Sequence, residues 1–486
     1  MMRYYLGIDI GTGSSKAIAF TGSGKILCSH ALGYQMLHPQ IGWCEQDPDH
    51  ILNAVVGSIN KVLDQLSPSP PLFISFSSVL HSLIAVDKDG ALLTNNIIWA
   101  DNRAADLAHD LGNTSVGKSF YHATGVPVHC MSPFSKLLWL KQYRHDLFER
   151  AYKFIGIKEY ILNKLLGAYV VDSSVASGTG LLNINTLKWD EEILNYAGIK
   201  SSQLSEVVSP TKILNYHGSY VELLLPDNIP FIIGASDGAL SNLGSGAMLS
   251  HQMAITIGTS SAARIITDQP ITDNEMRTFC YHLEGERYIA GGASNNGGVV
   301  LDWLKDSIFK NENGLEALLE EAALIPVGSE GLLFLPYILG ERSPLWNANA
   351  KGVFFGLTIQ HKQSHLMRAA IEAIMSVLYS IGKIVMEKRS ITELRASGGF
   401  AKSPFCLQVL ADIFNIKVVV SNTNESAALG AVMLGTMAVG IKSTFEDDIL
   451  SQHFPIKSNT EHYKRQFKRF TRLYELLKLE MSDGIQ

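Results

Sequence analysis

The chain has 486 residues, of which 46% are hydrophobic and 18% are charged, and its formal net charge is −6 at pH 7. This composition predicts a globular protein of roughly two to four domains, and the weakly acidic balance gives no electrostatic reason to expect a nucleic-acid partner. No apolar run approaches the ~20 residues of a membrane-spanning helix, and no secretory signal precedes the first predicted strand, so we expect no membrane partner and no export.

The first predicted element is a β-hairpin within YYLGIDIGTGSSKAIAF, residues 4–20. Two apolar runs flank a glycine turn, and Asp9 stands at the end of the incoming strand. The glycine spacing matches neither the P-loop nor the dinucleotide-binding fingerprint. From the residues alone two interpretations stay open: a turn whose N–H groups and hydroxyls hold phosphate, and an ordinary hairpin with a polar tip.

Strands and helices alternate through the rest of the first half, which predicts an α/β fold. Residues 72–93 contain two apolar runs with a turn signal at Asp89-Gly90, and residues 135–150 have helical spacing. Further along, the apolar run PFIIGA leads into Asp237 of the string GASDG. A carboxylate at the end of a buried strand is held rigidly, but Asp-Gly is also a common turn, and both interpretations remain.

The opening motif returns in the middle of the chain. The string AITIGTSSAARII at 254–266 matches GIDIGTGSSKAIA, so that Gly258-Thr259 repeats Gly11-Thr12 at an offset of 247 residues. The second copy has Thr256 in place of Asp9, so only the first copy offers a carboxylate to a metal ion.

Internal similarity at this spacing predicts two domains of similar fold, each beginning with a hairpin. We expect the boundary near residues 235–250, with domains at 1–243 and 244–486 and both hairpins facing one cleft.

The second half also alternates helices and strands. A long helix is predicted at 364–388 from apolar positions that recur at three and four residues, and ELRASGG ends a strand in two glycines. Ser403-Pro404 has the N-cap and first-turn pattern of a helix start. IKVVVSN then predicts a buried strand, and ESAALGAVMLGTMAVG a helix of small residues that packs closely against a neighbour.

The C-terminal stretch YKRQFKRFTRLYELLKL is rich in basic residues, which suggests a nucleic-acid surface. Its apolar residues, however, fall on one helical stripe. These are Tyr463, Phe467, Phe470, Tyr474 and Leu477. We therefore interpret the basic residues as the solvated face of an amphipathic helix.

The five cysteines are scattered and never occur in C-x-x-C spacing. They are Cys28, Cys44, Cys130, Cys280 and Cys406. Their odd number and spacing favour free thiols in a reducing compartment over disulfides or a zinc site, so we expect a cytoplasmic protein.

Taken in order, the Asp-bearing hairpin, GASDG, the second Gly-Thr hairpin and SGGFAKSPFCLQVLADIF resemble the FGGY carbohydrate kinases of the actin-like ATPase superfamily. MSPFSKLLWLKQ (131–142) is similar to one family signature, with Lys136 and Trp139 in place and Tyr143 as a departure at its end. GLTIQHKQSHLMRAAIE (356–372) is similar to the other. The resemblance runs from the first hairpin to about residue 440, and the joint order of the motifs carries it.

The resemblance implies an α/β fold in which two similar actin-like, ribonuclease H-like domains flank a central cleft. It implies ATP and Mg²⁺ as cofactors, with Asp9 as the metal carboxylate and Asp237 as the general base that takes the proton of a sugar hydroxyl. Phosphate or nucleotide contacts fall on Gly11, Thr12, Ser14, Ser15, Lys16, Gly258, Thr259, Gly298, Gly398, Gly399 and Ser403. For Ser403 a plain N-cap role, and for Gly298 a plain helix-start role, stay open.

On the substrate side the resemblance points to His81, Asp101, Arg103 and Asp237. Arginine's planar fork suits a sugar carboxylate, but a histidine satisfied within the core at position 81 and an exposed arginine at position 103 stay open.

Within the family, the stretches HSLIAVDKDG, IIWADNRA, SGTGLLNINTLKWDEEIL and GERSPLWNANAKG are most similar to the gluconate kinases. The resemblance therefore implies transfer of the γ-phosphate of ATP to a primary hydroxyl of a sugar acid, D-gluconate giving 6-phospho-D-gluconate. D-Xylulose or another polyol is the alternative acceptor, and an actin-like ATPase that acts on no sugar is the alternative of another class. The oligomeric state stays open, a homodimer included.

Overall fold

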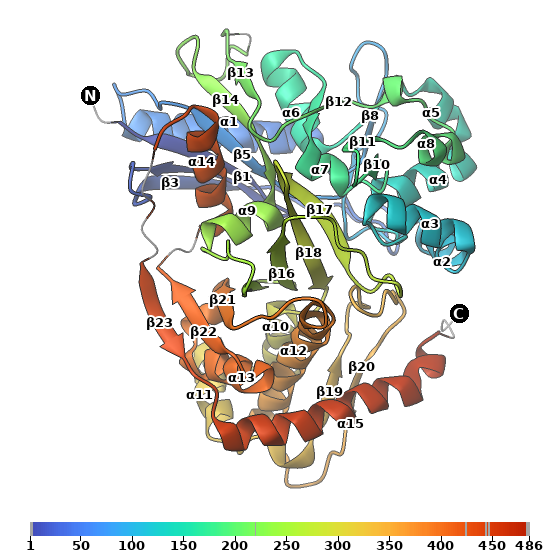
Figure 1. Ribbon diagram of the computed structural model, residues 1–486, viewed down its shortest axis with the longest axis vertical. Helices are drawn as coiled ribbons and strands as arrows, with labels where there is room; N and C mark the ends of the chain where they lie inside the picture. The colour runs from blue at the N-terminus through green and yellow to red at the C-terminus, as the bar shows by residue number, and fades with distance from the viewer. Residues whose placement is uncertain (1–2, 219, 423–424, 443–444, 446–447, 483–486) are drawn as a thin grey trace. The chain divides into compact units, whose positions relative to one another are not determined.

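The computed structural model describes residues 3–218, 220–422, 425–442, 445 and 448–482. The chain forms two compact units that interleave along the sequence (Figure 1). The first unit comprises Met1–Gly244, Thr267–Ile289 and Glu425–Glu446, and the second comprises Ser245–Ile266, Ala290–Asn424 and Asp447–Gln486.

The first unit is built on a six-stranded sheet of order β13-β14-β5-β1-β2-β3. Its strands are β1 (Tyr5–Ile10), β2 (Ser14–Phe20), β3 (Ile26–Gly33), β5 (Ile74–Ser78), β13 (Ile213–Asn215) and β14 (Pro230–Ser236). The three central strands β14, β5 and β1 are parallel, whereas β1, β2 and β3 form an antiparallel meander. The predicted opening hairpin is therefore confirmed as β1–β2.

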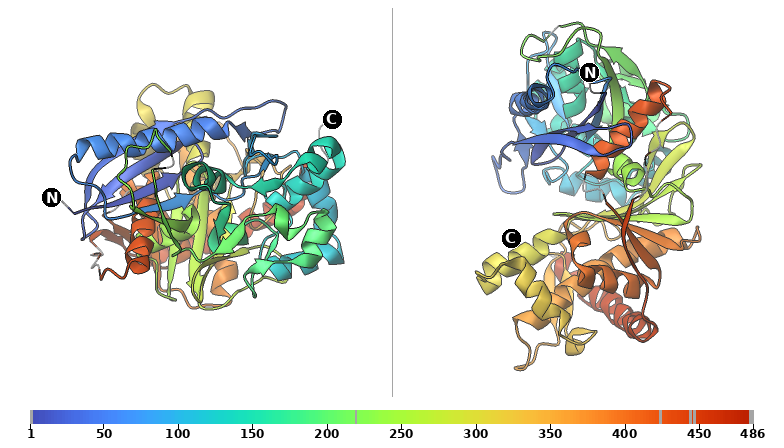
Figure 2. Two further views of the ribbon diagram at one scale, coloured as in Figure 1. Left: turned by 90° about the horizontal axis from the view of Figure 1, so that it is seen from above. Right: turned by 90° about the vertical axis from the view of Figure 1, so that its left-hand side faces the viewer.

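Helices cover both faces of this sheet, because successive side chains of each strand point to opposite faces. Leu6, Ile8 and Ile10 pack with α1 (Pro48–Gln65) and α6 (Ile157–Leu166). Tyr5 and Ile18 pack instead with α14 (Ser426–Ala438). Figure 2 shows α1 and α14 on opposite faces of these strands.

The small-residue helix predicted near residue 430 is α14, and it lies against α9 (Asp237–Gly244). A Cβ atom at Gly430 would come within 2.1 Å of the Leu240 carbonyl oxygen, and one at Gly244 within 1.9 Å of the Ser426 carbonyl oxygen. Only glycines permit this approach, so the expectation of close packing is confirmed.

Shorter elements complete the first unit. The helices are α2 (Ala105–Gly112), α3 (Ser115–Thr124), α4 (Pro133–Tyr143), α5 (His145–Arg150), α7 (Ser173–Ser177), α8 (Glu191–Ala197) and η1 (Ser201–Gln203). The strands are β4 (Glu45–Gln46), β6 (Ile84–Val86), β7 (Asn96–Ile97), β8 (Lys153–Ile155), β9 (Val170–Asp172), β10 (Leu182–Asn183), β11 (Lys188–Trp189), β12 (Glu206–Val208) and β17 (Phe279–Glu284).

The second unit has a sheet in which β18, β16, β15, β21, β22 and β23 follow one another. These strands are β15 (Gln252–Ile257), β16 (Ser261–Thr267), β18 (Arg287–Ser294), β21 (Glu393–Ser397), β22 (Lys417–Ser421) and β23 (Ile449–His453), and a separate pair is formed by β19 (Leu333–Pro336) and β20 (Gly352–Phe355). Its helices are α10 (Gly298–Trp303), η2 (Leu304–Phe309), α11 (Gly314–Ala323), η3 (Ser329–Gly331), α12 (Gln363–Met386), η4 (Gly399–Lys402), α13 (Pro404–Phe414) and α15 (Lys457–Ser482).

The internal repeat is visible in the strand pairing. β1 pairs antiparallel with β2 and parallel with β5, and β15 likewise pairs antiparallel with β16 and parallel with β21. Asp9 stands opposite Ser77 in the first unit, and Thr256 stands opposite Ser397 in the second. The α/β fold with two similar sheet-containing units is therefore confirmed.

The expectation that no apolar run approaches the length of a membrane-spanning helix was wrong. Helix α12 has 24 residues and is apolar enough, by length and composition, to cross a membrane. In the described part of the chain, however, 78% of its most apolar window is buried inside the protein. Because its apolar residues contact the interior, α12 is a core helix of the second unit.

The C-terminal helix α15 is amphipathic, as predicted. Tyr463 and Phe470 are buried, whereas Lys464, Arg465 and Lys468 are exposed. The basic residues therefore form the solvated face of a helix that packs through its aromatic stripe. The five cysteines are free thiols, which confirms that expectation.

Candidate active site

The first unit gathers polar residues where three parallel strands end. Asp9 lies near the end of β1, Ser77 near the end of β5, and Asp237 directly after β14. The strands are neighbours in the order β14-β5-β1, so Asp9 and Asp237 lie at the ends of strands two positions apart, and such strands are about 10 Å apart at the usual spacing. Ligands of α/β proteins commonly bind at such an edge.

Asp9 is a half-buried carboxylate with a neutral donor beside it. The Ser77 hydroxyl donates to Asp9 Oδ1 at 2.8 Å. Burial raises the pKa of Asp9, and the nearby carboxylate of Glu425 raises it further, although the Ser77 bond and Lys16 oppose this. A bound cation would offset the cost of this charge, and carboxylate oxygen is a ligand that Mg²⁺ accepts.

Hydrogen bonds hold the turn of the first hairpin, and the position of Gly13 at its tip is open. The Gly11 N–H donates to the Ser14 carbonyl at 3.0 Å, and the Tyr34 hydroxyl donates to the Gly11 carbonyl at 2.5 Å. The Trp99 indole donates to the Thr12 hydroxyl at 3.0 Å. A Cβ atom at Gly13 would meet no described atom within 4 Å, so the tip of the turn leaves room for a ligand.

Two predicted phosphate contacts are placed less favourably. Ser15 is fully buried, because strand alternation turns it to the face opposite Ser14 and Lys16. Its side chain therefore does not reach a ligand at the turn. Lys16 is 38% exposed, but its ammonium group pairs with the Glu425 carboxylate at 3.1 Å, which partly neutralises the expected point charge.

Asp237 lies where the sequence places it, after a buried strand, and it also begins α9. Its side chain is half-buried, and its Oδ1 atom accepts from the Gly238 N–H at 2.6 Å. The two interpretations of SDG therefore share one geometry: a tight turn into a helix that presents a partly accessible carboxylate.

His81 is held in an uncommon backbone conformation, with φ of 67°. Its Nδ1 atom lies 2.8 Å from the Gly178 carbonyl oxygen, and its Nε2 atom lies 3.4 Å from the Tyr281 hydroxyl. Because a carbonyl oxygen only accepts, Nδ1 carries a proton and donates to Gly178. Positive φ in a non-glycine residue often marks a functional site.

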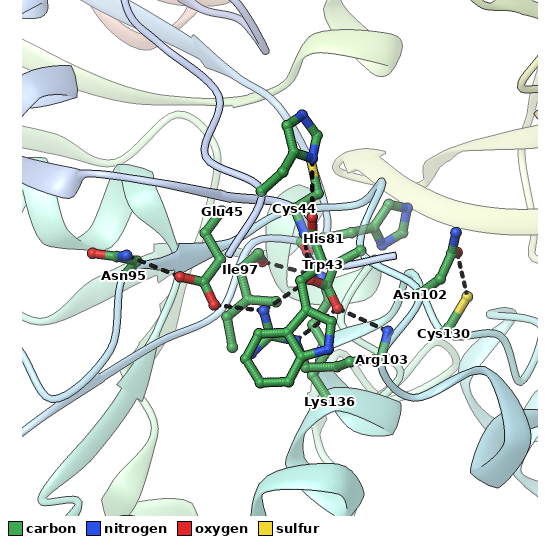
Figure 3. A network of polar contacts seen from close by, with 12 residues as sticks. Trp43, Cys44, Glu45, His81, Asn95, Ile97, Asn102, Arg103, Cys130 and Lys136 are labelled. Carbon is green, nitrogen blue, oxygen red and sulfur yellow. Dashed lines mark hydrogen bonds and ion pairs between the residues drawn. The ribbon is translucent and has the colours of Figure 1, made fainter. Parts of the chain in front are cut away.

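Asp101 and Arg103 bind each other, and Figure 3 shows Arg103 within the network that also contains Glu45 and Trp43. The Arg103 guanidinium donates to Asp101 at 2.8 Å and to Glu45 at 2.5 Å, and its side chain is 4% exposed. It stacks on Trp43, 3.8 Å from the ring centroid. With its fork occupied by two carboxylates, Arg103 has the contacts of a buried structural ion pair, which argues against the predicted substrate contact.

Lys136 also belongs to this network and is fully buried. Its ammonium group donates to the carbonyls of His81 and Ile97, the latter at 3.1 Å. Burial lowers the pKa of Lys136 to about 7, while Asp101 opposes the shift. The signature lysine therefore supports the main chain of His81.

In the second unit the repeated hairpin turns at Gly258 and Thr259, both exposed. The Gly298 N–H donates to the Gly258 carbonyl at 2.7 Å, and a Cβ atom at Gly298 would come within 2.8 Å of that oxygen. Gly298 begins α10, so it is a helix-start glycine that also contacts the hairpin.

The two glycines after β21 differ in what they require. Gly398 has φ of 96°, and a Cβ atom there would lie 2.3 Å from the Ile257 carbonyl oxygen. A Cβ atom at Gly399 would meet no described atom within 4 Å. Ser403 is the N-cap of α13, its hydroxyl accepting from the Cys406 N–H at 3.3 Å, which confirms the predicted helix start.

The sequence interpretation overlooked several partners at these sites. Trp99 and Tyr281 contact Thr12 and His81, and Glu425 pairs with Lys16 from 409 residues away. The sequence signal for Trp99 is its place in the string IIWADNRA. No sequence signal pairs Glu425 with a hairpin at the opposite end of the chain.

Comparisons with known proteins point to one family. Residues 4–244 match the N-terminal domain, and residues 253–439 the C-terminal domain, of the FGGY family of carbohydrate kinases. A gluconokinase from Bacillus licheniformis is 41% identical over 99% of this chain and 97% of its own.

Two solved structures from Lactobacillus acidophilus are similar as well. A gluconate kinase has a TM-score of 0.93 and 37% identity over 98% of both chains. A ligand-bound xylulose kinase has the same TM-score and identity over 98% of this chain and 99% of its own.

Proposed function

The chain belongs to the FGGY family of carbohydrate kinases, and we propose that it transfers the γ-phosphate of ATP to D-gluconate, giving 6-phospho-D-gluconate. The observation that carries the proposal is the pair of carboxylates, Asp9 and Asp237, that lie at the ends of two parallel strands of one sheet. The 41% identity to a gluconokinase supports the choice of acceptor.

Phosphoryl transfer to an alcohol requires that a proton leave the hydroxyl as its oxygen attacks phosphorus and ADP departs. We assign this proton to the half-buried Asp237 carboxylate, which is fixed by its place at the start of α9. A general base of this kind contributes roughly 10²–10⁴ in rate. We place His81 on the sugar side of the site, with its ring held by the Gly178 carbonyl oxygen and the Tyr281 hydroxyl.

Asp9 fits a divalent cation. It is a half-buried oxygen ligand whose charge is disfavoured by burial and by Glu425, and it has one hydroxyl donor at 2.8 Å. Mg²⁺ bound there, through water or directly, would supply neutralisation of the phosphate charge. The hairpin N–H groups and the hydroxyls of Thr12 and Ser14 contact phosphate oxygens.

In this proposal the halves 1–243 and 244–486 have different roles in binding and catalysis. The first half holds the metal ligand, the base and the sugar contacts. The second half holds the nucleotide through the hairpin at Gly258-Thr259 and the open position at Gly399. The free thiols are consistent with a cytoplasmic enzyme.

A coupled assay of ADP release tests the proposal, with D-gluconate, D-xylulose, other aldonic acids and no acceptor as parallel arms. We expect D-gluconate to give the highest kcat/KM and a product that is heavier by one phosphate. D-Xylulose is the second candidate, because the ligand-bound xylulose kinase is as similar in structure as the gluconate kinase. ATP turnover that no sugar stimulates would point to an ATPase of another class.

A further inference from the structure

The strand that leads to Asp237 contains a β-bulge. Ile232 pairs with Ser75 and Ala235 with Ser77, so two residues of β14 stand opposite the single residue Phe76. Gly234 lies in the bulge with φ of 72°, and a Cβ atom there would come within 1.7 Å of the Phe76 carbonyl oxygen. A bulge bends its strand and changes the direction of the residues that follow it.

The bulge removes backbone groups from the sheet ladder, and buried groups of this kind need other partners. The N–H groups of Ile233 and Gly234 donate to the carbonyls of Lys212 and Pro210 at 3.1 and 3.0 Å. The carbonyls of Ile233 and Ala235 accept from one side chain, the ammonium group of Lys158, at 3.1 and 3.4 Å.

Lys158 lies in the first turn of α6, and its side chain is 1% exposed. Its ammonium group also forms an ion pair with Asp172. Burial lowers the pKa of Lys158, and the charges of Asp172, Glu159 and Asp237 oppose that shift. The structure thus places the Lys158 ammonium group beside the end of β14, close enough to interact electrostatically with Asp237, the proposed base.

A second side chain holds the residue next to the base. The Ser174 hydroxyl lies 3.0 Å from the Ser236 hydroxyl and accepts from the Ser236 N–H at 3.3 Å. Ser174 lies in α7, whose N-cap is Asp172, with Oδ1 accepting from the Val175 N–H at 2.8 Å. Asp172 therefore connects both contacts, one through its ion pair with Lys158 and the other through the start of α7.

We propose that Lys158 and Ser174 are positioning residues for the phosphoryl transfer, which hold the bulged end of β14 so that Asp237 keeps a fixed place. Asp237 comes one residue after the last position that these side chains hold, and a base displaced by about 1 Å loses on the order of 10²-fold in rate. The inference rests on the proposed function and on Asp237 as its base.

The test measures kcat, the KM values for ATP and D-gluconate, and thermal unfolding in full-length variants. Lys158→Met alone leaves Asp172 buried without its cation, so the main variant is Lys158→Met with Asp172→Asn, because asparagine still caps α7. Ser174→Ala is the second variant and adds no unpaired charge. Lys164→Met, an exposed lysine of the same helix, is the matched control.

We expect kcat to fall roughly 10- to 100-fold in the double variant and severalfold in Ser174→Ala, with the KM for ATP within about twofold and Lys164→Met unchanged. In an Asp237→Asn background the same changes should cost less than about threefold, because no base remains to be positioned.

Equal losses in both backgrounds would show a general structural effect and overturn the proposal, as would a normal kcat in the double variant or, if that variant does not fold, in Ser174→Ala. Failure of the proposed function has a different signature: the wild-type enzyme would show no turnover with D-gluconate, or Asp237→Asn alone would keep its rate.

Discussion

The adjacent glycines 398 and 399 allow a test that separates a structural glycine from one that leaves space for a nucleotide. We compare Gly398→Ala with Gly399→Val. At Gly398 the backbone has φ of 96°, and the new Cβ atom would lie 2.3 Å from the Ile257 carbonyl oxygen. At Gly399 a Cβ atom meets no described atom within 4 Å, and φ lies outside the left-handed region.

The expected magnitudes follow from these contacts. Overpacking against the main chain costs about 1–3 kcal/mol, and positive φ in alanine costs about 1 kcal/mol more, so Gly398→Ala should lower the free energy of unfolding by about 2–4 kcal/mol. Gly399→Val should leave stability within about 1 kcal/mol. Its branched side chain occupies space that we assign to adenosine, which should raise the KM for ATP at least about tenfold, or about 1.4 kcal/mol.

Thermal unfolding and steady-state kinetics with D-gluconate check both variants. For Gly399→Val the KM for D-gluconate should stay within about twofold, since the sugar contacts belong to the other unit. A Gly399→Val enzyme with equal changes in both KM values, or with the unfolding loss expected of Gly398→Ala, would refute the reasoning that this glycine leaves space for the nucleotide.

Three further predictions concern the first unit. Asp237→Asn keeps the shape of the side chain but cannot take a proton, so kcat should fall by roughly 10²-fold or more while the KM for ATP barely changes; a near-normal kcat contradicts the assignment. Asp9→Asn should lower the rate and raise the Mg²⁺ concentration needed for half-maximal activity, and an unchanged Mg²⁺ titration would count against a metal role. Arg103→Met leaves Glu45 and Asp101 buried without their cation, so it should lower the free energy of unfolding by about 3–5 kcal/mol. The KM for D-gluconate should change little in the folded Arg103→Met enzyme, and a large rise would restore Arg103 as a substrate contact.

Local patterns predicted much of the fold. The alternation of apolar residues around Gly11 gave the first hairpin, and Ser403-Pro404 gave the start of α13, because turns and caps depend on neighbouring residues. The small-residue pattern around Gly430 predicted a close helix contact, although only the structure identifies the partner as α9. The sequence interpretation overlooked that α12 is long and apolar enough to cross a membrane. The burial of its apolar residues identifies it instead as a core helix.

The pairing of charges was not predictable, because it depends on residues far apart in the chain. Arg103 finds Glu45 58 residues earlier, and this contact changes it from an expected carboxylate-binding side chain into a buried ion pair. Ser15 looks like its hydroxyl neighbours in sequence, but the pleat of β2 turns it inward. Lys158 belongs to no motif, and only the bulge in β14 gives it a role.

The repeat explains why the polar chemistry concentrates in one unit. Both copies place a hydroxyl on the neighbouring parallel strand, Ser77 beside Asp9 and Ser397 beside Thr256, so the backbone plan is the same. In the second copy the Thr256 hydroxyl accepts from the Arg264 guanidinium at 3.0 Å and lies 3.1 Å from the Ser397 hydroxyl, an arrangement that needs no metal ion. In the proposed phosphoryl transfer the first unit supplies both the metal carboxylate and the base, which leaves no such role for the second copy, where a hydroxyl replaces the carboxylate. Its glycines can then serve the nucleotide, which is the division that the variants at Gly399 and Asp237 test from opposite sides.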